Sequence, residues 1–314
     1  MSMRTLMIHG RKVLPGERAQ INVPIAKLPS HTLIDLPVIV LRGTTPGPNL
    51  LLSAGIHGDE INGIETLRRL LQRPDLHPHK GSVLIMPLVN IYGFIHRSRT
   101  LPDGKDLNRS FPGGKQGSLA RQVAHIVMTK VLPNIDLGVD FHTGGNSITN
   151  YPQIRVHFEH DKAVEYAKAF GAPYVLNSGL ISNSFRKEAA KKGKPILVYE
   201  GGEALRLDDF AIEEGVAGVF RLMKYLGMIP GAVEPSTAEV MEGTTWVRAK
   251  ISGVFSSQVS YGKHVKRNQV IAEINDPFGQ TCVQLKSPME GVVVGLNNMP
   301  VVNAGDALIH LAHH

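Results

Sequence analysis

The sequence predicts an α/β fold, with a central mostly parallel or mixed sheet that has helices on both faces, followed by a smaller all-β C-terminal domain. Three observations predict it. Near-continuous Val/Ile/Leu runs alternate with amphipathic helical segments up to about residue 226, as in sheets buried on both faces. A polar stretch with two prolines follows at 229–237. From about residue 244 the helical period disappears and only short β-type runs remain.

The elements follow one another in a regular order. Residues 1–43 contain β-type runs broken by Pro and Gly, notably 19–26 and 32–43. An apolar strand, Leu50–Ala54, then leads through a Gly-containing loop into a helix, whose apolar face carries Ile61, Ile64, Leu67, Leu70 and Leu71. The same unit recurs as strands at 82–89, 136–141 and 195–200 and helices at 119–132, 161–170 (stopped by Gly171) and about 209–226.

The C-terminal segment contains a weak internal repeat. Gly253-Val-Phe followed by 265–274 is echoed by Gly291-Val-Val followed by 302–311. Two similar β halves predict a small pseudo-symmetric barrel or sandwich. We therefore expect two domains, 1–232 and 233–314, joined at the polar stretch.

Composition indicates a soluble globular protein. Of the 314 residues, 42% are hydrophobic and 19% charged, without the low hydrophobicity of disordered chains. The single cysteine, Cys282, excludes an intrachain disulfide. No apolar run approaches the ~20 residues that span a bilayer, and the first residues lack the apolar core of a signal peptide. We expect a cytoplasmic protein with no membrane partner.

The formal net charge of +7 is typical either of a nucleic-acid surface or of a site for small anions. The densest basic stretch, 186–194, follows a helical pattern and has no interleaved aromatic residue. This favours a solvated helix face over nucleic-acid binding. We expect no nucleic-acid partner.

Candidate catalytic residues follow three predicted central strands, where open α/β sheets place their ligand crevice. His57 and Glu60 follow the first, His142 the second, and Glu200 ends the third. Two histidines and one carboxylate with an open fourth position are typical of a catalytic zinc site. Zinc lowers the pKa of bound water to about 7, and Glu200 fits the role of the base that takes the proton.

Other interpretations of these residues stay open at this point. A lone H-x-x-E spacing is common by chance, and a histidine after a strand is more often a hydrogen-bonded loop residue. Glu200 alone can equally be a helix-capping or ion-pairing carboxylate. Only the joint placement at three strand ends favours a metal site.

Four ordered motifs carry a resemblance to a known family. They are GIHGDE at 55–60, DLNRSFPG at 106–113, DFHTGG at 140–145 and YEGG at 199–202. Together they resemble the succinylglutamate desuccinylase/aspartoacylase family of the zinc-carboxypeptidase superfamily over about residues 47–203. The resemblance implies one Zn²⁺ per chain, bound by His57, Glu60 and His142, with Glu200 as general base.

The resemblance also implies roles for residues that the spacing alone does not assign. Asp106 would orient a zinc-binding histidine. Asn108 and Arg109 would hold the substrate carboxylate, and Arg99 would polarise the scissile carbonyl and stabilise the oxyanion. Arg97 is a competing candidate for this role. Arg99 lies nine residues before Asn108, whereas the family's shorter members have about two fewer residues between the arginine and the asparagine. Arg186 is a further candidate for reaching the substrate, against its interpretation as a solvated helix residue.

The C-terminal repeat resembles biotinyl or lipoyl carrier modules, and by the family resemblance it borders the active-site entrance. Those modules present a modified lysine in the hairpin between their halves. This chain has NDPFGQ at 275–280 instead, with no lysine, so we expect no carrier function.

The leading hypothesis is a zinc amidohydrolase that deacylates an N-acyl amino acid or related small anionic amide. A metallocarboxypeptidase or peptide amidase would use the same metal centre. A non-catalytic binding protein with a retained hydrolase fold is the alternative of another class. The sequence leaves open the acyl group, the amino acid and whether the chain forms a homo-oligomer.

Overall fold

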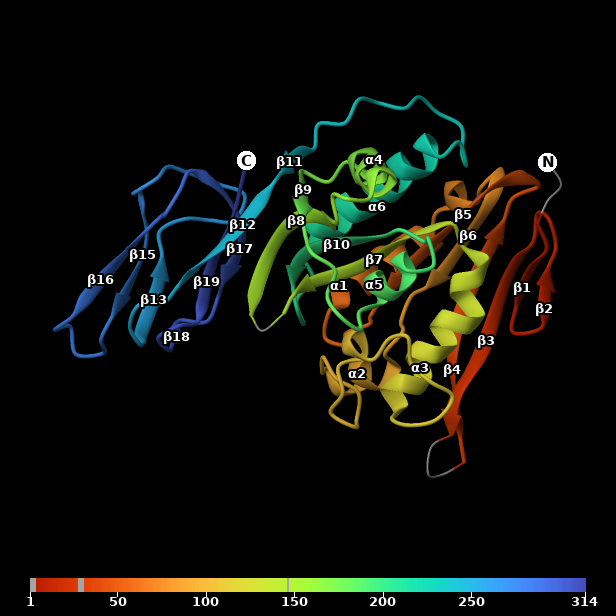
Figure 1. The fold of residues 1–314 in the computed structure, drawn as a ribbon, viewed down its shortest axis with the longest axis horizontal. Helices are drawn as coiled ribbons and strands as arrows, with labels where there is room; N and C mark the ends of the chain where they lie inside the picture. Colours follow the sequence, from red (N-terminus) through yellow and green to blue (C-terminus); the bar gives the residue numbers. More distant parts are fainter. Residues whose placement is uncertain (1–3, 28–30, 146) are drawn as a thin grey trace.

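The computed structural model describes residues 4–27, 31–145 and 147–314. Within them, a 13-stranded mixed sheet runs in the order β12-β19-β17-β8-β10-β7-β5-β6-β4-β3, with β9, β11 and β14 attached beside this path (Figure 1). Its strands are β3 (Arg18–Lys27), β4 (Leu33–Arg42), β5 (Thr45–Ala54), β6 (Lys80–Met86), β7 (Leu137–Gly144), β8 (Ile148–Val156), β9 (Tyr174–Asn177), β10 (Ile196–Glu203), β11 (Glu239–Met241), β12 (Gly243–Arg248), β14 (His264–Val265), β17 (Gly291–Asn297) and β19 (Ala307–His313). The predicted α/β class is confirmed.

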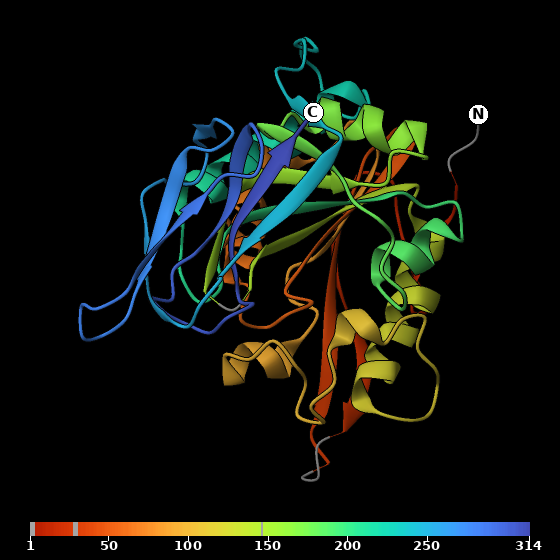
Figure 2. The same cartoon turned by 60° about the vertical axis from the view of Figure 1, so that its left-hand side comes forward.

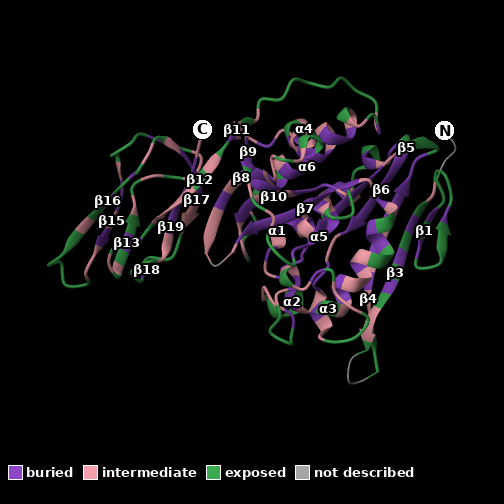
Figure 3. Ribbon diagram, viewed as in Figure 1, coloured by how far each residue is buried: buried purple, intermediate pink, exposed green. Residues whose placement is uncertain are grey.

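The centre of the sheet is parallel and its flanks are antiparallel. β6, β5, β7 and β10 pair in parallel, whereas β4 joins β6 and β8 joins β10 antiparallel. Near-continuous apolar sequences form these central strands because both faces are buried, as Figure 3 shows. Parallel pairing brings the carboxyl ends of β5, β7 and β10 to one edge of the sheet.

Helices cover both faces. They are α1 (Ile61–Leu71), α2 (Ile91–His96), α3 (Leu119–Ile126), α4 (Asp161–Phe170), α5 (Phe185–Ala190) and α6 (Asp209–Tyr225), with short turns η1 (Pro74–Leu76), η2 (Leu107–Arg109), η3 (Val127–Val131) and η4 (Leu132–Asn134). Leu50 and Leu52 of β5 pack toward α1, α4 and α6, whereas Leu51 packs toward α3 and α5. Alternate residues of β5 therefore belong to the two hydrophobic cores on opposite faces of the sheet. No helix of the described residues is long and apolar enough to cross a membrane.

The strands expected at 50–54, 136–141 and 195–200 occupy 45–54, 137–144 and 196–203, and two predicted elements end at least three residues earlier than expected. The helix expected at 119–132 ends at Ile126 and continues as a π turn and a 3₁₀ turn, since Pro133 has no N–H to continue an α-helical ladder. The strand expected at 82–89 ends at Met86, because Pro87 cannot donate to a sheet ladder.

The C-terminal part adds a four-stranded sheet, ordered β16-β15-β13-β18. Its strands are β13 (Gly253–Ser257), β15 (Val270–Asn275), β16 (Cys282–Lys286) and β18 (Val301–Val302), and a small hairpin of β1 (Leu6–Ile8) and β2 (Arg11–Val13) lies at the other end of the molecule. The internal repeat is visible in the pairing. Gly253 of β13 pairs with Val302, and Gly291 of β17 pairs with Val265, so each half supplies a strand to the other.

The C-terminal part is also continuous with the main sheet. β17 pairs antiparallel with β8, and β19 and β12 extend the same sheet outward (Figure 2). The segment at 229–238 contains no helix or strand and leads into β11, which pairs with β9. The division at residue 232 stays a prediction, and the two parts share one hydrogen-bonded sheet.

One cluster of ion pairs joins helix α1 to helix α6. Arg69 of α1 contacts Glu65 of its own helix at 2.8 Å, and Asp209 and Glu213 of α6 at 2.6 and 2.5 Å. Arg68 and Arg69 lower the pKa of Glu65 to about 2. Arg69 joins α1 to α6 through Asp209 and Glu213, and ionised Glu65 stabilises α1 by pairing with Arg68 and Arg69.

We predict that Glu65→Gln lowers the free energy of unfolding by about 1 kcal/mol at pH 7. Because the pKa of Glu65 is lowered on folding, its contribution is present above the ordinary glutamate pKa and is lost as the pH falls toward 2. Thermal unfolding at pH 7 and pH 3 should show a smaller difference between variant and wild type at pH 3. Glu234→Gln, in the exposed 229–238 segment, is the matched control. A difference that is independent of pH would contradict the prediction.

Candidate active site

Two adjacent strand ends bring three buried side chains together. His57 and Glu60 lie in the connection between β5 and α1, and His142 lies on β7, which pairs with β5. Their exposed fractions are 2%, 2% and 5%. Gly58 lets this connection approach α2, since a Cβ there would lie 1.9 Å from the carbonyl carbon of Gly93. One ligand atom from each of the three side chains falls within 4.8 Å of the others, so the group could hold a metal ion.

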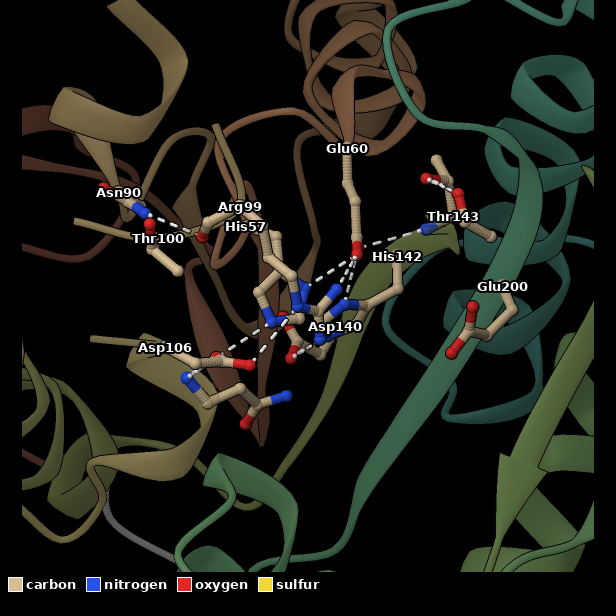
Figure 4. Close-up of polar contacts among 12 residues, drawn as sticks. His57, Glu60, Asn90, Arg99, Thr100, Asp106, Asp140, His142, Thr143 and Glu200 are labelled. Atoms are coloured by element: carbon tan, nitrogen blue, oxygen red, sulfur yellow. Dashed lines mark hydrogen bonds and ion pairs between the residues drawn. The ribbon is translucent and has the colours of Figure 1, made fainter. Parts of the chain in front are cut away.

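Carboxylates fix both imidazoles. His57 Nε2 lies 3.1 Å from Asp106 Oδ1, and His142 Nε2 lies 2.9 Å from Asp140 Oδ2. The Ser53 hydroxyl donates to the other carboxylate oxygen of Asp140, Oδ1, at 2.7 Å. A histidine that donates Nε2–H to a carboxylate carries its lone pair on Nδ1. Figure 4 shows both rings turned toward Glu60. Nδ1 of His57 lies 2.7 Å from Glu60 Oε1, and Nδ1 of His142 lies 2.7 Å from Glu60 Oε2.

This donor set fits a metal ion. Nδ1 of His57 is buried and makes no hydrogen bond to a described group, although Glu60 Oε1 is 2.7 Å away. Lone pairs of two neutral imidazoles facing one carboxylate repel it unless a positive charge lies among them. Two imidazoles and one carboxylate are a common ligand set for zinc. The donor atoms are therefore arranged for a cation.

The electrostatics of the cluster favour positive charge. Burial acts to raise the pKa of Glu60, but His57 and His142 outweigh it and hold that pKa well below its usual range. Burial acts to lower the pKa of His142, but Asp140 and Glu60 raise it well above the ordinary value. The carboxylates thus attract a cation to this point of the protein, whether a proton or a metal ion.

The structure places Arg99, and not Arg97, at the cluster. Arg99 donates to Glu60 Oε1 at 2.9 Å and to Asp106 Oδ2 at 3.3 Å, and it lines the cavity described below. Arg97 is exposed and ends α2 with a left-handed backbone, φ 52°. The contacts of Arg99 with Glu60 and Asp106 therefore distinguish it from the exposed Arg97.

Glu200 lies on β10 directly beside His142 of β7, its partner in the parallel register. Figure 4 shows it next to the cluster. Its Oε2 accepts a hydrogen bond from Asn150 Nδ2 at 2.9 Å, and Arg155 lies 3.4 Å from Oε1. Both partners belong to β8, the strand on the other side of β10. The Glu200 carboxylate is thus held in one orientation.

Asn108 and Arg109 lie in η2, just after Asp106. The Asn108 side-chain oxygen accepts a hydrogen bond from the backbone N–H of Phe185 at 2.9 Å, which joins η2 to the start of α5. Arg109 is exposed and donates to the Asn108 carbonyl. Both residues line the same cavity as the cluster.

The residues proposed for the site enclose one cavity of about 260 Å³. It is lined by His57, Glu60, Arg99, Asn108, Arg109, His142, Arg186 and Glu200, and also by Ile148, Asn150, Arg155 and Trp246. A larger cavity of about 810 Å³, beside η1 and α6, lies at the amino ends of the parallel strands and includes none of these groups. The chemistry therefore belongs to the smaller cavity.

Arg186 corrects one expectation from the sequence. It was expected on a solvated helix face, but it is only 9% exposed and its guanidinium donates to the carbonyls of Arg155, Ser178 and Gly179. Burial lowers its pKa to about 10. Within the described residues no ion pair at contact distance is found for its guanidinium, although the charge of Glu200 acts to raise its pKa. The helical pattern marks α5 but does not indicate that its first turn faces the cavity.

Asn150, Arg155 and Trp246 line the cavity although no sequence pattern indicated them. Asn150 and Arg155 follow no motif, and they meet Glu200 only because β8 pairs with β10. Trp246 belongs to the C-terminal part and reaches the cavity through β12 and β19. The one signal in the sequence was that Trp246 is the single tryptophan of the chain.

Known proteins resemble this chain in sequence and in fold. Residues 46–226 match the succinylglutamate desuccinylase/aspartoacylase catalytic domain. N-alpha-acetyl-L-2,4-diaminobutyric acid deacetylase from Halomonas elongata is 30% identical over 291 residues, which cover 87% of this chain and 84% of the relative. A succinylglutamate desuccinylase/aspartoacylase structure from Rhodobacter sphaeroides is 25% identical with a TM-score of 0.83, covering 95% of both chains.

The product-bound structure of the ectoine utilization protein EutE (DoeB) from Ruegeria pomeroyi shares the fold, with a TM-score of 0.84 at 24% identity over 96% of this chain and 97% of that chain. The family match spans more than half of the chain and includes His57, Glu60 and His142. The chain belongs to the succinylglutamate desuccinylase/aspartoacylase family, whose members are deacylating hydrolases.

Proposed function

We propose that this protein is a zinc-dependent amidohydrolase that deacylates a small N-acyl amino acid. The observation that carries the proposal is the pair of imidazole Nδ1 atoms that face one buried carboxylate, with Glu200 on the next strand. A curated relative named as a deacetylase of an acetylated amino acid supports the reaction class.

His57, Glu60 and His142 would hold the zinc ion. Bound zinc would supply a Lewis acid that polarises the scissile carbonyl and acidifies a water molecule. Glu200 acts as the general base that takes the proton of the attacking water and then passes it to the leaving amine. Asn150 and Arg155 keep the Glu200 carboxylate oriented for this transfer.

Arg99 stabilises the negative charge that develops on the carbonyl oxygen. It lies against Glu60 and Asp106 at the edge of the cavity, so its guanidinium is close to the cluster without an induced movement of the backbone. A fixed cation at this position is more effective than solvent, because it needs no reorganisation during the reaction.

The cavity favours a small anionic substrate. Arg109, Asn108 and Arg186 line one part of it, and Arg186 is a buried cation whose described partners are neutral oxygens. A substrate carboxylate would supply a negatively charged partner at contact distance, whereas Glu200 interacts with Arg186 only from farther away. The volume of about 260 Å³ lies below the roughly 300–1,000 Å³ of common ligand pockets, which favours a small amide over a peptide.

The first prediction concerns the metal. Purified protein should bind about one equivalent of Zn²⁺, and His57→Ala and His142→Ala should each lower zinc affinity by more than about 100-fold. Calorimetric titration of the metal-stripped protein measures this. Glu200→Gln is the control and should retain the wild-type affinity. Loss of zinc binding in Glu200→Gln would reassign Glu200 as a ligand.

The second prediction concerns the reaction. The zinc-loaded protein should release primary amine from N-acetyl or other short N-acyl amino acids, and a chelator should abolish the activity. Glu200→Gln should lower kcat by at least about 10²–10⁴-fold, because no other side chain takes the proton. Amine release across acetyl, succinyl and longer N-acyl amino acids measures both. Cleavage of peptide C-termini with no activity on this panel would instead indicate a carboxypeptidase.

The third prediction compares two neighbouring arginines. Arg99→Ala should lower kcat by about 10²–10³-fold, the cost of one lost oxyanion donor. Arg97→Ala removes the same side chain two residues earlier, where it is exposed, and should leave kcat unchanged. Equal losses in both variants, with both proteins folded, would contradict the assignment of Arg99.

A further inference from the structure

The C-terminal part supplies one wall of the cavity. Trp246 of β12 lines it and stacks on His310 of β19, with ring centroids 4.3 Å apart and ring planes only 1° from parallel. His310 is 6% exposed, so the imidazole forms a fixed base beneath the indole. The stack holds the indole in one orientation.

His310 is a neutral ring in this stack. Burial and the nearby Arg155 lower its pKa to about 3. Its Nδ1 is buried and has no hydrogen-bond partner within the described part of the chain. A buried polar atom without a partner is unfavourable for folding. The flat contact with Trp246 is therefore the interaction that explains the position of this ring.

Strand pairing connects the Trp246–His310 stack to Asn150, which donates a hydrogen bond to Glu200. Trp246 pairs with His310, His310 with Gly295, and Gly295 with Asn150, across four neighbouring strands. A Cβ at Gly295 would lie 3.0 Å from Asn150 Oδ1 and 3.1 Å from the His310 Cβ. The side chains of Asn150 and His310 thus meet above Gly295 on one face. That face runs from Glu200 to Trp246.

The order of the strands gives the cavity two ends. Asn108 and Arg109 lie beside Asp106, which contacts His57 next to β5. Trp246 lies on the other side, beyond β7, β10 and β8 in the sheet. A substrate with its carboxylate at Arg109 and its amide carbonyl at the His57, Glu60 and His142 cluster directs its acyl group away from Arg109. The acyl group then faces Trp246.

We propose that Trp246 is a specificity-determining residue that packs against the acyl group, and that His310 is a positioning residue for the indole. The proposal rests on the proposed deacylase function. It commits to an uncharged, short alkyl acyl group. Ile148 and Trp246 offer apolar surface to the cavity, and Arg155, a cation that lines the same cavity, is paired with Glu200 at 3.4 Å.

Substitution of Trp246 tests the proposal. In Trp246→Ala, kcat/KM for an N-acetyl amino acid should fall about 10-fold, chiefly through KM, because the acyl group loses its apolar contact. The decrease in kcat/KM should be smaller for the N-butyryl substrate, because the shorter alanine side chain leaves room for the longer butyryl group. Trp246→Phe should be intermediate. Phe278→Ala, which removes an aromatic side chain that is 83% exposed in the same C-terminal part, should leave both values unchanged.

The kinetics of two His310 variants test its role as a positioning residue. His310→Phe keeps a flat ring under the indole and should retain wild-type kinetics. His310→Ala should raise KM while kcat stays within about twofold, because the indole loses its orientation but the catalytic groups do not. An equal loss of kcat in both variants would indicate a merely structural role.

Fluorescence gives a readout that does not depend on turnover. Trp246 is the single tryptophan, so its emission reports this wall alone. Titration of the zinc-loaded protein with butyrate, the acid released from an N-butyryl substrate, should change the emission in a saturable way. If the wild-type protein hydrolyses no N-acyl amino acid, the deacylase proposal fails and the butyrate titration still decides whether Trp246 contacts an acyl group. If hydrolysis occurs but the acetyl-to-butyryl ratio in Trp246→Ala equals that of wild type, or butyrate leaves the emission unchanged, the role of Trp246 is overturned.

Discussion

A buried carboxylate between two imidazoles is the interaction on which the arrangement of the catalytic part depends. Glu60 is 2% exposed and contacts His57, His142 and Arg99. An ionised carboxylate at this depth is unfavourable unless positive charge surrounds it. Each of its three partners lies on a different element. The connection after β5, the turn after α2 and strand β7 must therefore all adopt their native positions before Glu60 is stabilised.

Hydrogen bonds and ion pairs around these residues connect this centre to the rest of the sheet. Asp106 and Asp140 fix the two imidazoles, and Asn150 and Arg155 fix Glu200. The strand that carries Asn150 pairs with β10 on one edge and with β17 on the other. The C-terminal part is thus joined to the centre by backbone hydrogen bonds, not only by surface contact. This continuity explains how a β segment so late in the sequence contributes a wall to the cavity.

The sequence predicted those features that depend on local patterns. Runs of apolar residues located β5, β7 and β10, and parallel pairing was enough to bring His57, His142 and Glu200 to one edge. Features that depend on long-range pairing could not be predicted. Gln153 of β8 and Val294 of β17 are hydrogen-bonded although they are 141 positions apart, and no periodicity records that contact. Arg186 was misjudged for a related reason, since a helical period gives the face of a helix but not the element opposite it.

The pairing of β8 with β17 has a consequence for the order in which the molecule is made. The metal-ligand candidates and Glu200 are all synthesised before residue 201, whereas Gly295 and His310 emerge from the ribosome much later. Translation at about 5–20 residues per second leaves several seconds in which residues 148–150 of β8 exist without β17, whereas β9 can already pair with 153–156 of the same strand. During that interval this part of the sheet edge is unprotected, and nascent chains in the same polysome offer strands that could occupy it.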